Sequence, residues 1–353
     1  MPCNVSRRQN DLPRPCGQPN RYSCSGVFAF AFLWASLSYA AVPIKNVIFC
    51  IGDGMGTGQV AAARCYAGTN LVFERFPHQS RISTLAAGGY VTDSAAAATA
   101  IATGQKVNCD VISLAVPGDA TELETLLEYF KGLGKHTGLV TTAYLTDATP
   151  AAFGAHAYSR SFHSLIASNC LQHTRPEVLL GGGSDGLDAA AAEAAGYAVV
   201  TDAASLETVD AARTLRVCGL FGSGLLPYGY DGLGGLPSLS DMTVKALEIL
   251  ARHPEGFFLM VEGGLIDMAC HSSDLPRCIG ETLAFNAAVQ KIVEWAGDRD
   301  DTLILVTADH ETGGLAVTAD NGQGRCRMSR GRLAEVTRRL LSLCMAGAQM
   351  RIV

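Results

Sequence analysis

The chain has 353 residues, of which 48% are hydrophobic and 17% are charged. Because this apolar content is enough for a large core, disorder of the whole chain is excluded. Its 38 glycines follow no strict period, which excludes a collagen-like rod, and no run of 18 apolar residues interrupts the body of the chain, which excludes a multi-span membrane protein. The formal net charge of −6 argues against electrostatic binding to nucleic acid.

The first 40 residues have the layout of a secretory signal. Four arginines precede a short apolar stretch, Gly26–Ala40, which ends in the small residues Ser38 and Ala40. A basic region, an apolar region and a small-residue end are the three parts of a signal peptide. We therefore expect residues 1–40 to be a signal peptide or an N-terminal anchor, and the mature chain to be exported to the periplasm or the extracellular space without a membrane span.

Four short apolar runs in the rest of the chain predict buried strands. They are Asn46–Ile51, Gly138–Thr142, Phe257–Val261 and Thr302–Thr307. Continuous apolar runs of this length are typical of strands buried on both faces, as in a parallel sheet. Residues 181–240 are richer in Gly and Ala, and we expect them to form loops and peripheral elements rather than a second core.

Helical patterns lie between the predicted strands. Thr121 and Glu124 have capping-box spacing, which predicts a helix that starts at this point and stops at Gly134. Further amphipathic helices are predicted at Asp241–Ala251 and Glu281–Gly297. Strands that alternate with helices indicate an α/β fold in which a mostly parallel sheet is covered on both faces.

Each predicted strand is followed by polar side chains of the kinds that bind metals or react. In chain order they are Asp53, then Asp147 and Thr149, then Glu262 and Asp267, and finally Asp309 and His310. The carboxyl ends of parallel strands meet at one edge of a sheet, where ligands bind, so we expect these side chains to lie together. Carboxylates placed close together repel one another, and bound cations would offset that repulsion.

The donor types indicate two kinds of metal. Asp267 and His271 are four residues apart, on one face of a helix, and Asp309 stands beside His310; both pairs suit zinc. A third set offers only oxygen atoms, which suits magnesium. Its members are Asp53, Thr149 and Glu262.

Ser94 is the candidate nucleophile. It opens the alanine-rich helical segment Val91–Gly104, and a helix N-terminus favours a phosphate group through its free N–H groups and its dipole. A serine that faces metal ions at this point can be activated for attack. Arg160 could bind two phosphate oxygens at once. Taken singly, the serine also fits a helix cap and the arginine an exposed surface position.

Five long motifs occur here in the order found in the alkaline phosphatase family, which the chain resembles from about Ile44 to about Ala319. They are VIFCIGDGMG, YVTDSAAAATAIATG, TDATPAAFGAH, VEGGLIDMACH and VTADHETGG. The resemblance implies a three-layer α/β/α sandwich with a mostly parallel central sheet. It also implies hydrolysis of small phosphate monoesters through a phosphoserine intermediate, and a homodimer in an exported compartment.

The same resemblance implies a role for each candidate residue. Ser94 corresponds to the nucleophile and Arg160 to the phosphate-binding arginine. Asp147 corresponds to a position near the magnesium ion and is expected to contribute to substrate binding. The implied ligands are Asp53, Asp309 and His310 for one zinc, Asp267 and His271 for a second zinc, and Asp53, Thr149 and Glu262 for magnesium.

The chain departs from the family at two places. The second zinc of the family takes a third protein ligand, a histidine near the C-terminus, and no histidine follows His310 here. Residues 321–353 are rich in arginine and resemble nothing in the family. A frameshift or truncation before about Asn321 would explain both, so we expect a catalytic domain over residues 41–320 that is incomplete at its C-terminal end. Met268 also replaces a polar residue that is often found beside the metals.

Two other functions remain open from the sequence. One is a phosphodiesterase or phytase-like relative on the same scaffold, and the other is a truncated chain that binds metal or phosphate without turnover. Sulfatase-like chemistry is disfavoured because Ser94 is followed by two alanines and not by the C/S-x-P-x-R setting of that family.

Overall fold

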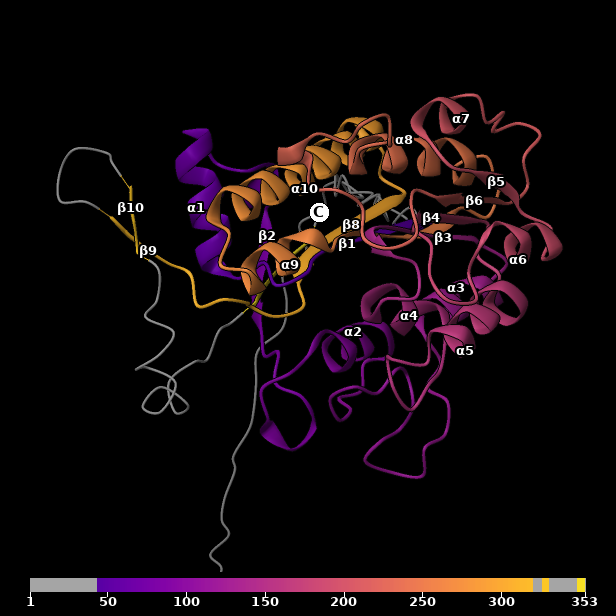
Figure 1. Cartoon of the computed structure of the whole chain (residues 1–353), viewed down its shortest axis with the longest axis horizontal. Coiled ribbons are helices and arrows are strands. Elements are labelled where there is room, and N and C mark those ends of the chain that lie inside the picture. The colour runs from indigo at the N-terminus through magenta and orange to yellow at the C-terminus, as the bar shows by residue number, and fades with distance from the viewer. Residues whose placement is uncertain (1–42, 320–325, 330–347, 353) are drawn as a thin grey trace, which may run out of the picture. The chain divides into compact units, whose positions relative to one another are not determined.

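A computed structural model describes residues 43–319, 326–329 and 348–352, and side chains up to residue 317 (Figure 1). The expected signal peptide lies outside the described residues, as does most of the arginine-rich tail. Within the part that is described, no helix has both the length and the apolar character needed to cross a membrane.

A sheet of nine strands forms the middle layer of the described fold, in the order β2-β11-β8-β1-β7-β3-β4-β6-β5. The seven strands from β8 to β5 are parallel, and β11 runs antiparallel to both of its neighbours. A separate antiparallel pair joins β9 and β10. The strands are β1 (Asn46–Gly52), β2 (His78–Ile82), β3 (His136–Tyr144), β4 (Val178–Gly182), β5 (Ala198–Val200), β6 (Val217–Leu220), β7 (Phe257–Gly263), β8 (Thr302–Ala308), β9 (Ala316–Ala319), β10 (Cys326–Ser329) and β11 (Ala348–Ile352).

The central strands have apolar side chains on both faces because each face carries its own core. In β7, Leu259 and Val261 pack into one hydrophobic cluster, while Phe258 and Met260 pack into the other. All seven residues of β7 are buried. This two-sided burial is why the predicted strands appear in the sequence as continuous apolar runs, and all four of those predictions are confirmed to within two residues at each end.

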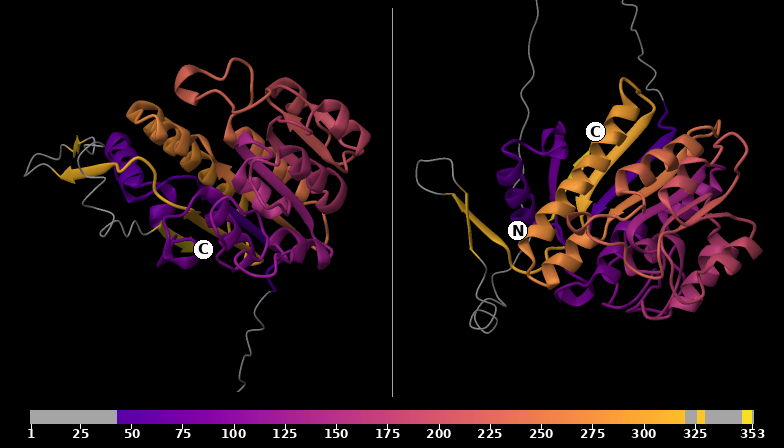
Figure 2. Two further views of the ribbon diagram at one scale, coloured as in Figure 1. Left: turned by 60° about the horizontal axis from the view of Figure 1, so that its bottom comes forward. Right: turned by 45° about the horizontal axis from the view of Figure 1, so that its top comes forward.

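Helices cover both faces of the sheet, as Figure 1 shows and as Figure 2 shows from two further directions. One face carries α1 (Thr57–Ala67), α7 (Ala203–Glu207), α8 (Leu239–Leu250), α9 (Leu265–His271) and α10 (Leu275–Ala296). The other face carries α2 (Ser94–Thr103), α3 (Leu126–Gly132), α4 (Ala148–Gly154), α5 (His163–Ser168) and α6 (Ala189–Ala194). Short 3-10 helices are η1 (Val72–Arg75), η2 (Ala87–Gly89) and η4 (Gly229–Asp231), and η3 (Asn169–Thr174) is a π-helical continuation of α5. The expected α/β/α sandwich with a mostly parallel central sheet is confirmed.

Two local predictions need correction. The capping box of α3 is formed by Thr125 and Glu128, one turn later than predicted, because Thr121 is held in a turn by the side chain of Asp119. Residues 181–240 are also less peripheral than expected, since they contribute β5 and β6 to the main sheet. These strands have only three and four residues, too short to produce a clear apolar pattern.

Candidate active site

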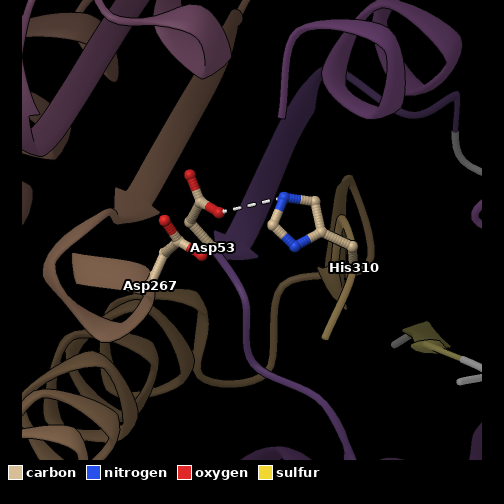
Figure 3. Close-up of side chains that lie close together, drawn as sticks. All are labelled: Asp53, Asp267 and His310. Atoms are coloured by element: carbon tan, nitrogen blue, oxygen red, sulfur yellow. Dashed lines mark ion pairs between the residues drawn. The ribbon is translucent and has the colours of Figure 1, made fainter. Parts of the chain in front are cut away.

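The carboxyl ends of β1, β7 and β8 bring three candidate ligands together. Gly52, the last residue of β1, lies level with the last residues of β7 and β8, so the loops that follow leave the sheet at one height. Figure 3 shows Asp53, Asp267 and His310 gathered at this edge. Their potential ligand atoms all lie within 4.8 Å of one another. The three residues can therefore serve one divalent ion or two adjacent ions.

Ser94 holds its hydroxyl beside this cluster. Its Oγ lies 3.1 Å from Nε2 of His310 and 3.5 Å from Oδ1 of Asp53. The residue is buried and is the first of α2, where backbone N–H groups are free and the helix dipole is positive. The structure thus places a nucleophile, an anion-binding helix end and metal-ligand candidates at one point.

The residue that caps α2 is Asp93 and not Ser94. The Asp93 carboxylate accepts hydrogen bonds from the backbone N–H groups of Ala96 and Asp110, each 3.0 Å long. A capping serine would turn its hydroxyl toward the helix backbone, so the aspartate leaves Ser94 to face the cluster. Asp93 is not among the site residues predicted from the sequence, although an aspartate directly before the first helical residue is a strong capping signal.

Arg160 is held between two carboxylates. Its guanidinium lies 2.9 Å from Asp147 Oδ1 and 3.6 Å from Asp93 Oδ2. Burial lowers the pKa of Arg160, but the charges of Asp147 and Asp93 outweigh that effect and leave the pKa raised. The guanidinium is therefore oriented and fully charged. Because Asp93 also caps α2, one carboxylate links the arginine to the helix end that carries Ser94.

Glu262 and Thr149 present unpaired oxygen atoms in the interior. One carboxylate oxygen of Glu262 accepts a hydrogen bond from the Thr141 hydroxyl, while its other oxygen, Oε1, and the Thr149 hydroxyl oxygen are buried without a hydrogen-bond partner. Burial, followed by the charge of Asp147, raises the pKa of Glu262 to about 8. Buried oxygen donors that lack partners are the chemistry expected of a magnesium site, so these residues fit that ion.

Asp267 and His271 meet on one face of α9, as their spacing predicts. Nε2 of His271 lies 3.2 Å from Oδ2 of Asp267, and the other carboxylate oxygen accepts a hydrogen bond from the hydroxyl of Thr312. The same Thr312 hydroxyl lies 3.2 Å from Nδ1 of His310. Thr312 thus fixes two candidate ligands, and sequence analysis missed it because a lone threonine has no distinctive spacing. The side chain of His271 is 68% exposed, so this pair lies at the open side of the cluster.

The site concentrates negative charge in the interior. Burial, then the charges of Asp309 and Asp267, raises the pKa of Asp53. Burial also raises the pKa of Asp309, although His310 and the backbone N–H group of Gly54 oppose the shift. Oδ2 of Asp309 is a further buried atom without a hydrogen-bond partner. Carboxylates packed this closely are stable in their charged forms only if cations offset their charge, so the donor set fits divalent metals.

A cavity of about 660 Å³ opens onto these groups. Its lining includes the nucleophile candidate, the arginine and members of the metal-ligand set. They are Ser94, Arg160, Asp267, His271 and His310. Met268 also lines the cavity, at the position where sequence analysis noted the loss of a polar side chain. The cavity is large enough for a small ester whose phosphate group sits at the floor.

The family model described as alkaline phosphatase matches residues 44–337. The chain belongs to the alkaline phosphatase family. The matched range extends past Ala319, where the resemblance read from the motifs was expected to end.

Curated relatives of this alkaline phosphatase family member include several bacterial enzymes. Alkaline phosphatase 3 of Bacillus subtilis is 37% identical over 78% of this chain and 63% of its own length. Alkaline phosphatase of Escherichia coli is 34% identical over 79% of this chain and 72% of its own. Streptomycin-6-phosphate phosphatase of Streptomyces griseus is 35% identical over 76% and 74%. This chain therefore spans less than two thirds of the Bacillus enzyme.

Solved structures agree with the family assignment. Alkaline phosphatase from the Antarctic bacterium TAB5 superposes with a TM-score of 0.73 at 27% identity, over 88% of this chain and 91% of that one. The cold-active enzyme of a Shewanella species superposes with a TM-score of 0.72 at 36% identity, over 78% and 70%.

Proposed function

We propose that the chain is a metal-dependent hydrolase of phosphate monoesters that acts through a phosphoserine intermediate on Ser94. One observation carries the proposal. The Ser94 hydroxyl lies at a helix N-terminus, 3.1 Å from His310 Nε2, in a cavity that Arg160 also lines. Family membership supports the reaction class, and the relatives named phosphatases support phosphate esters as substrates.

The donor sets indicate which residues would hold each metal. Two zinc ions would be bound, one by Asp53, Asp309 and His310 and the other by Asp267 and His271. Asp53, Thr149 and Glu262 would bind magnesium. When bound, divalent ions stabilise negative charge on the attacking and leaving oxygen atoms of a phosphoryl transfer. A zinc site normally takes at least three protein ligands, so Asp267 and His271 would be part of the ligand set of the second zinc.

The protein residues supply positioning and charge. Arg160 would bind two non-bridging oxygens of the phosphate, and the free N–H groups at the start of α2 would bind beside it. Ser94 Oγ would then form a bond to phosphorus while the bond to the leaving alcohol breaks. Water would next attack the phosphoserine, releasing inorganic phosphate and restoring the Ser94 hydroxyl. Asp147 would hold the guanidinium in place through its 2.9 Å contact.

Covalent labelling tests the nucleophile. Protein incubated with ³²P-labelled phosphate and quenched in acid should carry label on the peptide that contains Ser94, and Ser94→Ala should abolish that label. Ser80→Ala, at an exposed serine of β2, is the matched control and should label like the wild type. Label that persists in Ser94→Ala would assign the nucleophile to another residue.

Substrate comparison separates the main proposal from the alternatives. A monoesterase should hydrolyse monoesters faster than diesters, because a diester lacks one of the charges that Arg160 would bind. The opposite preference would favour the phosphodiesterase alternative, and metal binding without turnover of either substrate would favour a non-catalytic chain.

Export and a homodimeric assembly are further proposals that rest on the N-terminal pattern and on the family. Cell fractionation and analytical ultracentrifugation of the mature protein test them.

A further inference from the structure

Two thiols face each other at the edge of the cavity. Sγ of Cys270 donates a hydrogen bond to Sγ of Cys278 over 3.4 Å, and both residues are buried and are not joined by a disulfide. Cys270 is the last but one residue of α9 and Cys278 is in the first turn of α10. No step of the proposed reaction uses either thiol.

The turn between the two helices holds the sulfur atoms in this position. The backbone N–H of Ser273 donates to the carbonyl of Cys270, and the N–H of Cys278 donates to the carbonyl of Asp274, each over 2.9 Å. Ser273 adopts the left-handed conformation, with φ of 53°, which reverses the chain direction between the helices. A disulfide bond is about 2.05 Å long, so the sulfurs need to approach by little more than one ångström.

Access to the pair comes from the active-site side. Cys270 lines the cavity, whereas Cys278 packs behind it in the hydrophobic cluster. Gln59 of α1 donates a hydrogen bond to Sγ of Cys270 over 3.5 Å and so helps to fix that sulfur. A small disulfide compound that enters the cavity would meet Cys270 first.

We propose that Cys270 and Cys278 form a reversible disulfide that ties the end of α9 to the start of α10. The oxidant is a low-molecular-weight disulfide, RSSR. Cys270 sulfur attacks one sulfur of RSSR and releases RSH, which leaves a mixed disulfide on the protein. Cys278 sulfur then attacks the Cys270 sulfur and releases the second RSH. Two protein thiols are oxidised, one RSSR is reduced to two RSH, and each protein thiol proton ends on a released thiol.

The bond would stiffen the segment that carries Asp267 and His271. Both residues lie on α9, within one turn of Cys270, and among the described residues only the main chain through residues 272–274 joins this helix covalently to α10. Oxidation would therefore determine how firmly that pair is held. This inference concerns the thiols alone and does not depend on the proposed phosphatase reaction.

Mass spectrometry after equilibration in glutathione redox buffers tests the proposal. Trypsin cleaves after Arg277 and places the two cysteines on separate peptides. A disulfide therefore joins two peptides that are otherwise detected at separate masses. In oxidising buffer the wild-type protein should lose two alkylatable thiols, at Cys270 and Cys278, and yield the linked peptide. Cys278→Ser should keep one glutathione on Cys270, and Cys218→Ser, at a buried cysteine of β6, should form the link like the wild type.

Hydrogen exchange gives a second readout on the wild-type protein. Backbone amides of residues 265–278 should exchange more slowly in the oxidised form, and reduction should reverse this change. Folded wild-type protein in which both thiols remain fully alkylatable in the most oxidising buffer would overturn the proposal. A linked peptide without slower exchange would overturn the stiffening.

Discussion

Replacement of Arg160 tests the part of the account that distinguishes a phosphate site from a general metal site. The guanidinium contacts Asp147 and Asp93 and is 28% exposed toward the cavity. In the proposed complex it donates two charge-assisted hydrogen bonds to phosphate, each worth about 1.5–3 kcal/mol. Arg160→Ala should thus cost about 3–6 kcal/mol of transition-state stabilisation, or about 10²–10⁴-fold in kcat/KM.

The lysine variant separates the contribution of the charge from that of the second hydrogen-bond donor. Arg160→Lys keeps the charge but loses the planar second donor, so it should cost about 1.5–3 kcal/mol, or about 10-fold to 100-fold in kcat/KM. Arg277→Lys is the matched control, because Arg277 also contacts two aspartates but lies outside the cavity; it should keep wild-type activity.

Steady-state kinetics with a monoester, together with the inhibition constant of inorganic phosphate, measures these losses. Thermal unfolding checks that each variant is folded, since Arg160→Ala leaves the buried Asp147 carboxylate without its ion pair. The reasoning fails if Arg160→Ala is folded and binds phosphate as tightly as the wild type.

Three further predictions concern the metals and the core. In metal-free protein the raised pKa of Glu262, about 8 against an ordinary 4.5, means that the folded state binds the proton more tightly than the unfolded state. The contribution of Glu262 to the free energy of unfolding should therefore be greatest below about pH 4.5. It should fall by up to about 5 kcal/mol as the pH rises to about 8. Glu262→Gln should flatten this part of the profile of Tm against pH, and an unchanged profile would contradict the raised pKa of Glu262. A chelator should abolish activity and added zinc should restore it. Full activity after exhaustive chelation would count against a metal mechanism. Phe258 is fully buried and stacks on Phe130 and Phe153 at centroid distances of 5.3 and 5.9 Å. Phe258→Ala should therefore reduce the free energy of unfolding by about 3–5 kcal/mol in a urea titration, whereas a loss below about 1 kcal/mol would show that the core is loosely packed.

The sequence predicts the centre of the fold better than its edges. β1, β3 and β7 are buried on both faces, and β8 is buried on one face and partly buried on the other, so their apolar runs are visible without a structure. β2, with the sequence HQSRI, is mostly exposed, and its partner β11 is more than 260 residues away in the chain, so no local pattern marks this pair. Edge strands take their place from pairing and not from burial, which is why periodicity does not find them.

The candidate site shows the same division between local and non-local information. The spacing of Asp267 and His271 predicts their contact on α9, because helix geometry alone determines it. The roles of Asp93 and Thr312 depend on α2 and on the loop after β8 meeting at the sheet edge, and no spacing in the chain encodes that meeting. The facing thiols of Cys270 and Cys278 likewise depend on the turn between two helices.

The proposed chemistry requires divalent ions in the cluster of Asp53, Asp267 and His310 beside the Ser94 hydroxyl. Anomalous scattering at the zinc edge, from crystals grown with zinc, magnesium and phosphate, would locate these ions. We expect zinc peaks at this cluster, with phosphate between Ser94 and Arg160. Zinc found only on exposed histidines elsewhere, with the cluster empty and no phosphate near Ser94, would refute the proposed metal site.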